Sequence, residues 1–87
     1  MYYVYILQEI NNRKLYIGYS SDLKSRFKAH KNGGVRSTKS GTYKLIYYEA
    51  YTNKQDATGR EKFLKGGSGR KYINKQLRNY FSDSDES

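Results

Sequence analysis

Two tyrosines near the N-terminus are spaced so that their hydroxyls could act together. If Asn11 and Asn12 form the turn of a hairpin, Tyr5 lies opposite Gly18, and Tyr16 stands diagonally from Tyr5 on the same face. The two phenols could be presented to a ligand, or both rings could belong to the core. A phenol has an ordinary pKa of about 10, so a tyrosine that acts as a base needs strong help from nearby cations.

Arg26 and His30 are one helical turn apart and therefore share a helix face, which also carries Leu23 and Phe27. A planar guanidinium suits bidentate contact with a phosphate. A neutral imidazole could orient a nucleophile or carry a proton. A solvated arginine and a histidine packed at the edge of the core are the alternative for this pair taken alone.

Glu61 is the most anomalous carboxylate, because it lies midway along the apolar stripe of Ala57 and Leu64. A buried carboxylate costs several kcal/mol unless it is paired, protonated or bound to a cation. One interpretation is an ion pair with Arg60, Lys65 or a basic residue of the preceding helix. The other is a ligand for a hard cation such as Mg²⁺, which is often held by one or two carboxylates together with water and phosphate oxygens.

Two phenols, a guanidinium, an imidazole and one carboxylate in positive surroundings match phosphodiester hydrolysis with one metal ion. Other chemistries lack their residues. The chain has no cysteine and a single histidine, which excludes a cysteine nucleophile and a multi-histidine zinc site. The glycine-rich segment 66–71 lacks the spacing of a nucleotide-phosphate loop and follows a predicted helix rather than a strand.

The charge points to a polyanion. Seventeen lysines and arginines face eight acidic residues, which gives a net charge of +9, and three of the acids lie in the last five positions. Nucleic acid is the expected partner of so basic a domain, although surface charge can also serve solubility alone. The basic residues expected to contact nucleic acid are Lys24, Lys28, Lys31, Arg36, Lys39, Lys65, Arg70 and Lys71.

The elements that must position these residues follow the order β-β-α-β-α-α, which belongs to the α+β class: a three-stranded sheet, at least partly antiparallel, flanked by helices. The predicted strands are 2–7, 14–20 and 43–51, and the predicted helices are 22–31, 54–65 and 69–80. Residues 1–80 are expected to form one domain and residues 81–87 a disordered acidic tail. No apolar run approaches the ~20 residues that span a bilayer, and no signal-peptide pattern opens the chain, so we expect a cytoplasmic protein without membrane contact.

Over roughly residues 1–80 the chain resembles the GIY-YIG nuclease domain, in the small stand-alone form found in bacteria. The likeness rests on several short motifs in order: Tyr3-Val4-Tyr5, Tyr16-Ile17-Gly18, Leu23 with Arg26 and His30, L-I-Y-Y-E (45–49), A-x-x-R-E-K-x-L-K (57–65) with Glu61, and Asn74 in Y-I-N-K. Three positions depart from the family pattern. Tyr3 and Val4 replace the glycine and isoleucine of the first motif, and Tyr19 is expected to narrow or line the cleft.

The resemblance implies an antiparallel sheet and a metal-dependent DNA endonuclease of DNA repair or recombination, with RNA as an alternative substrate. It implies that Glu61 holds Mg²⁺ or Mn²⁺ and that no small-molecule cofactor is needed. It implies further that Tyr5 or Tyr16 positions or deprotonates water and that Arg26 stabilises phosphate charge. His30 would assist proton transfer, and Asn74 would support the site through hydrogen bonds.

The alternative function is a non-catalytic nucleic-acid-binding protein on a nuclease scaffold, since a fold does not determine an activity. The five residues at positions 5, 16, 26, 30 and 61 favour the enzyme, because a binder has little reason to keep a costly carboxylate on an inward stripe. The sequence leaves the oligomeric state open.

Overall fold

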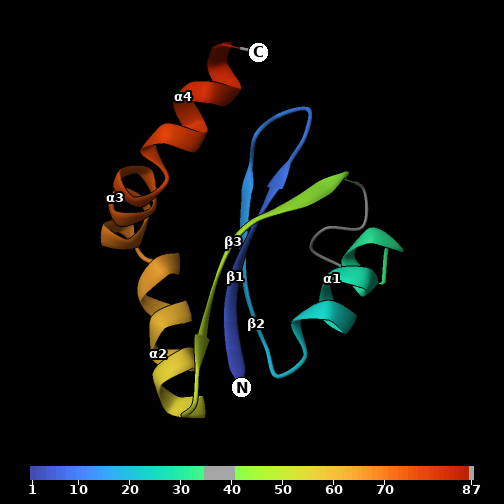
Figure 1. The fold of residues 1–87 in the computed structure, drawn as a ribbon, viewed down its shortest axis with the longest axis vertical. Helices are drawn as coiled ribbons and strands as arrows, with labels where there is room; N and C mark the ends of the chain where they lie inside the picture. The colour runs from blue at the N-terminus through green and yellow to red at the C-terminus, as the bar shows by residue number, and fades with distance from the viewer. Residues whose placement is uncertain (35–40, 87) are drawn as a thin grey trace.

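A computed structural model describes residues 1–34 and 41–86 and has the predicted α+β architecture. The strands are β1 (Tyr2–Glu9), β2 (Leu15–Ser20) and β3 (Tyr43–Tyr51), and the helices are α1 (Leu23–Lys31), α2 (Lys54–Lys65), α3 (Gly67–Gln76) and α4 (Arg78–Glu86). The strands form one antiparallel sheet in the order β2-β1-β3. Figure 1 shows α2, α3 and α4 along one side of the sheet and α1 on the other.

The hairpin between β1 and β2 has the predicted register but a longer loop. Tyr5 pairs with Gly18 and Leu7 with Tyr16, as the alternation of side chains requires. The expected two-residue turn at Asn11-Asn12 is wrong. The Arg13 N–H donates to the Glu9 carbonyl at 3.0 Å, and Arg13 adopts a positive φ of 63°. The carboxylate of Glu9 accepts bonds from the backbone N–H groups of residues 11 and 12, which stabilises the wider loop without changing the pairing.

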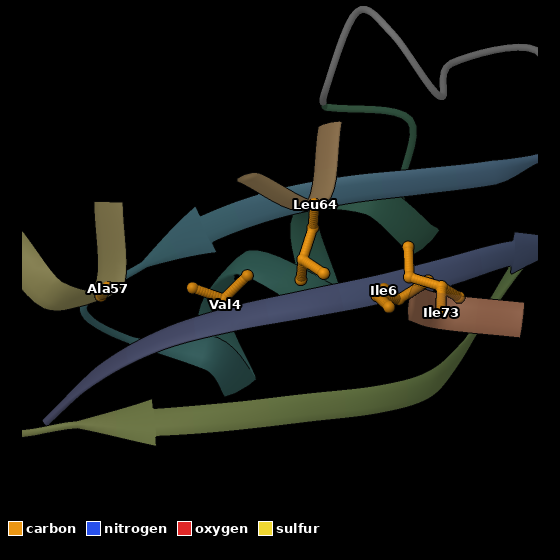
Figure 2. Close-up of a cluster of buried hydrophobic side chains, with 5 residues drawn as sticks. All are labelled: Val4, Ile6, Ala57, Leu64 and Ile73. Atoms are coloured by element: carbon orange, nitrogen blue, oxygen red, sulfur yellow. The ribbon is translucent and has the colours of Figure 1, made fainter. Parts of the chain in front are cut away.

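The two faces of β1 have different roles. Val4 and Ile6 face α2 and α3 and form a hydrophobic core with Ala57, Leu64 and Ile73, which Figure 2 shows in close-up. The alternate residues of β1, such as Tyr5, point to the opposite face, toward α1. The core and the candidate site therefore lie on opposite faces of one strand.

A β-bulge adapts β3 to these two faces. The pairing of β1 with β3 shifts by one residue between Ile6 and Leu7, so Ile46 is the extra residue of β3. Both Ile46 and its neighbour Tyr47 pack against the hydrophobic core as a result. Beyond the bulge, Tyr48 lies opposite Tyr5 on the face toward α1.

The C-terminal helical region differs from the single helix expected over 69–80. The chain breaks at Leu77 into α3 and α4, and the Leu77 N–H still donates to the Ile73 carbonyl at 2.9 Å. The break lets Leu77 and Phe81 both pack against the core, while the Tyr80 hydroxyl donates to Oε1 of the buried Gln8 at 2.6 Å. Residues 81–86 are helical here, where the composition favours a tail without structure; the domain boundary at residue 80 stays a prediction.

None of the helices in residues 1–34 and 41–86 is long and apolar enough to cross a membrane.

A bidentate ion pair ties β3 to α2. Arg60 donates from Nε and a terminal nitrogen to the two Glu49 oxygens at 2.9 and 3.1 Å, and its guanidinium stacks 4.3 Å from the Tyr72 ring centroid. The hydroxyls of Tyr47 and Tyr51 donate to the same carboxylate. Burial opposes ionisation of Glu49, but hydrogen bonds from Arg60 and the two tyrosines hold its pKa below the ordinary value.

We expect Arg60→Ala to lower the free energy of unfolding at pH 7 by about 1–3 kcal/mol, because Glu49 would lose its charged partner. Since the folded-state pKa of Glu49 is lowered, its contribution is present above pH 4.5 and is lost as the pH falls through the folded-state pKa. Urea denaturation at neutral and acidic pH should show a difference between wild type and variant that shrinks with acidification. Lys65→Ala breaks an exposed pair and should cost less than ~1 kcal/mol. A loss independent of pH would assign the effect to packing on Tyr72 instead.

Candidate active site

The centre of the candidate site is a buried tyrosine–histidine pair. The Tyr5 hydroxyl lies 2.8 Å from Nε2 of His30, and the two residues are 0% and 3% exposed. Tyr16 packs against both, with ring centroids 4.9 Å from His30 and 6.3 Å from Tyr5. The structure thus brings the two motif tyrosines and the histidine into one cluster on the α1 face of the sheet.

Local structure explains how His30 reaches this position. Asp22 caps α1, accepting a hydrogen bond from the Ser25 N–H at 3.2 Å, and so defines where the helix begins. His30 lies in the last turn of the same helix and is its one buried residue. The face predicted from the spacing of Leu23, Phe27 and His30 is the face that turns toward the sheet.

Gly18 makes room for the pair. A Cβ built at Gly18 would overlap the hydroxyl oxygen and ring of Tyr5, its partner across the hairpin. The phenol of Tyr5 therefore occupies the space that any other residue at position 18 would fill. The glycine of the second motif is a requirement of the Tyr5–His30 contact.

Both members of the pair are held in their neutral forms at pH 7. Burial lowers the pKa of His30, and the positive charge of Arg26 lowers it further. Burial also raises the pKa of Tyr5, and this outweighs the opposing interaction with Arg26. Desolvation therefore outweighs the help from cations that Tyr5 would need to act as a base.

Arg26 extends the cluster toward solvent. It is exposed on α1, one turn before His30. Interaction with the phenols of Tyr5 and, more weakly, Tyr16 raises its pKa, so its guanidinium is a permanent positive charge at the mouth of the cluster. The role of Arg26 in binding phosphate stays a prediction.

Glu61 lies at the margin of the apolar stripe rather than within the core. Its side chain is 22% exposed, and Oε2 forms an ion pair with the Lys65 Nζ at 3.1 Å. One of the partners considered from the sequence is thus present, although that lysine side chain is largely exposed. Glu61 is close enough to the cluster for its negative charge to raise the pKa of Tyr5. Within residues 1–34 and 41–86, histidine and carboxylate side chains form no group of three or more that could hold a metal.

The remaining predicted residues lie around this cluster. Asn74 is exposed on α3, beside the core residue Ile73, and none of the hydrogen bonds described for residues 1–34 and 41–86 joins it to the tyrosines. Tyr19 is on the opposite face of the sheet from Gly18, stacked on Tyr2 with centroids 6.4 Å apart. The expectation that Tyr19 lines the cleft is wrong because adjacent strand residues point to opposite faces.

The predicted nucleic-acid contacts fall into two exposed groups. Lys24, Lys28 and Lys31 lie along α1, and Lys65, Arg70 and Lys71 lie on α2 and α3; Arg36 and Lys39 fall outside the described residues. A groove of about 560 Å³ beside the β2 edge is lined in part by Tyr16, Lys65 and Arg70. Tyr16 therefore belongs both to the buried cluster and to a basic groove, a connection that the sequence pattern did not reveal.

The fold and the site define the class of GIY-YIG nuclease domains. An α+β sheet carries a cluster of two motif tyrosines and a histidine, with an arginine at its mouth and the motif glycine against Tyr5. The sequence model of the GIY-YIG catalytic domain matches residues 1–80, and the chain belongs to this family. No solved structure matches it at a significant level.

Several curated relatives are named as UPF0213 proteins. One from Clostridium perfringens is 43% identical over 67 residues, which cover 75% of this chain and 71% of the relative. One from Streptococcus agalactiae is 38% identical over 65 residues, covering 72% and 73% of the two chains. Another, from Pediococcus acidilactici, is 38% identical over 82 residues, covering 90% and 82%.

The close approach at Gly18 makes a prediction about stability. Gly18→Ala should lower the free energy of unfolding by about 1–3 kcal/mol, because the new methyl group overlaps the Tyr5 phenol. The matched control is Gly59→Ala in α2, where a Cβ meets nothing within 4 Å, and which should raise stability by about 0.5–1 kcal/mol. Urea denaturation of both variants measures the effect. Equal stability of the two variants would show that the Tyr5 ring is not confined by Gly18.

The single histidine allows its protonation to be followed directly by NMR. We expect the His30 pKa to lie below 6.5 in the folded protein, and Arg26→Ala to raise it part of the way back, since burial remains. Stability linked to this shift is present above pH 6.5 and is lost as the pH falls through the folded-state pKa, because folding favours the neutral ring. Lys28→Ala, on the exposed side of α1, should leave the pKa unchanged. A pKa at or above 6.5 in wild type would contradict the neutral pair.

Proposed function

We propose that this protein is a metal-dependent endonuclease that hydrolyses phosphodiester bonds in DNA, in repair or recombination. The observation that carries the proposal is the convergence of the Tyr5–His30 pair, Tyr16 and Arg26 on one sheet face, with Glu61 within electrostatic reach. A structural core would not need a permanent cation beside two phenols and an imidazole. The family membership of the chain supports the same activity.

The residues present fit one hard cation. Glu61 is a partly exposed carboxylate whose partner is a flexible, exposed lysine that substrate phosphate could draw away. Mg²⁺ is commonly bound through one or two carboxylates, with water and phosphate oxygens completing its shell. We therefore assign Mg²⁺ or Mn²⁺ to Glu61. When bound, the ion supplies positive charge to the scissile phosphate and lowers the pKa of a water molecule.

The other side chains of the site have separate roles in hydrolysis. Arg26 binds the non-bridging oxygens and stabilises the charge that develops when water attacks phosphorus and the ester bond breaks. Tyr16 orients the attacking water or, in its phenolate form, accepts the proton of that water. We assign this role to Tyr16 because it is partly exposed and lines the groove, whereas Tyr5 is fully buried. The Tyr5–His30 pair positions Tyr16 through ring contacts, and the neutral imidazole is available to carry a proton. Asn74 is proposed as a supporting residue on the family resemblance alone.

Exposed lysines and arginines bind the DNA backbone. One group of basic residues lies on α1, and the other lies on α2 and α3. Neither the first turn of α1 nor the first turn of α3 contains an acidic residue. Phosphate contacts of this kind depend strongly on salt and carry little sequence information. Affinity for DNA should therefore fall steeply with ionic strength.

The test is a cleavage assay on supercoiled, linear, single-stranded and branched DNA and on RNA, with Mg²⁺ or Mn²⁺. Wild type should cut DNA, Glu61→Gln should abolish cutting, and Arg26→Ala should lower the rate by roughly 100-fold or more. Because the partner of Glu61 within residues 1–34 and 41–86 is an exposed lysine, Glu61→Gln should change stability by less than ~1 kcal/mol.

Asp56→Asn removes a charge from the first turn of the same helix and should cut like wild type. Cutting by all variants would indicate a contaminating nuclease. DNA binding without cutting by wild type would contradict the proposal and favour a non-catalytic binding protein on this scaffold.

A further inference from the structure

A second hollow lies between the start of α1 and β3, apart from the groove beside β2. It has a volume of about 440 Å³, and its walls are mainly the side chains of Tyr3, Leu23, Phe27, Leu45 and Tyr48. Because Tyr48 pairs with Tyr5 and Leu45 with Leu7 across the sheet, this pocket lies on the face that carries the catalytic cluster. None of the roles assigned to the cluster uses these residues.

The aromatic side chains of the pocket are not explained by the core. Tyr48 is 54% exposed, and its ring meets the ring of Tyr3 edge-on, with centroids 6.1 Å apart and planes at 62°. The hydrophobic core lies on the other face of the sheet. Tyr3 stands where the first family motif has glycine, so this residue supplies a wall that the motif itself does not require.

The rim of the pocket is suited to an anion beside an apolar group. Lys24 is exposed at the rim, and Lys28 and Lys31 continue along the same helix. Among the described residues that line the pocket, the one carboxylate is Asp22, which caps α1 by accepting bonds from the Ser25 N–H and hydroxyl. An aromatic slot bordered by lysines matches a nucleotide, with the base in the slot and its phosphate at the lysines.

We propose that this pocket binds one unstacked nucleobase, so that the protein selects nucleic acid with an unpaired nucleotide near the cleavage site. The size lies within the range of pockets that bind small molecules. Bases stacked inside a duplex could not enter it, whereas bases of single strands, bulges, flaps and junctions are free to stack on tyrosine. The inference rests on the proposed function, and it names the structural class of the substrate.

The test measures binding without divalent metal, so that cleavage does not intervene. Two short DNA duplexes of the same sequence are compared, one fully paired and one with a single extra 2-aminopurine nucleotide that reports stacking by its fluorescence. Tyr48→Ala should weaken binding of the bulged duplex by roughly tenfold and leave the paired duplex nearly unchanged. Tyr48→Phe keeps the ring and should bind like wild type, with the same fluorescence change.

A charge control separates the base from the phosphate. Lys24→Ala should weaken binding of both duplexes, whereas Lys75→Ala, which removes the same charge from α3, should have the smaller effect. The inference is overturned if Tyr48→Ala weakens both duplexes equally, if it weakens neither, or if 2-aminopurine fluorescence does not change with wild type. Binding that depends on Tyr48 in a protein without nuclease activity would support the base pocket and contradict the proposed function, so the two failures can be told apart.

Discussion

The close contact between Tyr5 and Gly18 is the constraint on which the rest of the site depends. A strand residue without a side chain lets a neighbouring phenol lie flat across the hairpin and remain buried. In that position the hydroxyl meets Nε2 of His30, and α1 is held against the sheet by a polar contact as well as by its apolar face. Arg26, one turn earlier on the same helix, is thereby brought to the mouth of the cluster. The absence of a Cβ at Gly18 thus permits the contact that joins the β1–β2 hairpin to α1 and brings the residues of the candidate site together.

The sheet separates the residues that stabilise the fold from the residues of the candidate site. The hydrophobic core and the Glu49–Arg60 pair occupy the face toward α2 and α3, and the tyrosine–histidine cluster occupies the face toward α1. Because successive residues of β1 serve the two faces in turn, each can be optimised without changing the other. The β2 edge is the place where they meet, since Tyr16 borders the groove formed with α2 and α3. Glu61, on α2, acts on the cluster through its charge from the helix that also builds the core.

The buried part of the candidate site is neutral, and its exposed part is positively charged. Desolvation keeps Tyr5 and His30 neutral, while Arg26 stays charged at the surface, so a phosphate would meet positive charge first and neutral proton donors and acceptors behind it. The lysines along α1 extend this positive surface toward the aromatic pocket of Tyr3 and Tyr48. The proposed phosphate-binding and base-binding positions therefore lie on adjacent parts of one sheet face. Such an arrangement offers selectivity to a domain too small to enclose a long stretch of duplex.

Local sequence pattern determined most of the helices and strands and the relative positions of several candidate site residues. Period-two alternation placed Tyr5, Tyr16 and Gly18 in the correct register, and helical spacing placed Arg26 and His30 on the right face, because both depend only on neighbouring residues. Tertiary structure decided what local pattern cannot encode. Packing of Leu77 and Phe81 broke the last helix, and the carboxylate of Glu9 widened the hairpin loop. The approach of α2 to the sheet left Glu61 partly exposed beside Lys65. The aromatic pocket joins Tyr3 to Tyr48, far apart in the chain, and exists only because β3 pairs with β1. Contacts of this kind depend on which surfaces meet in space, which no periodicity in the sequence specifies.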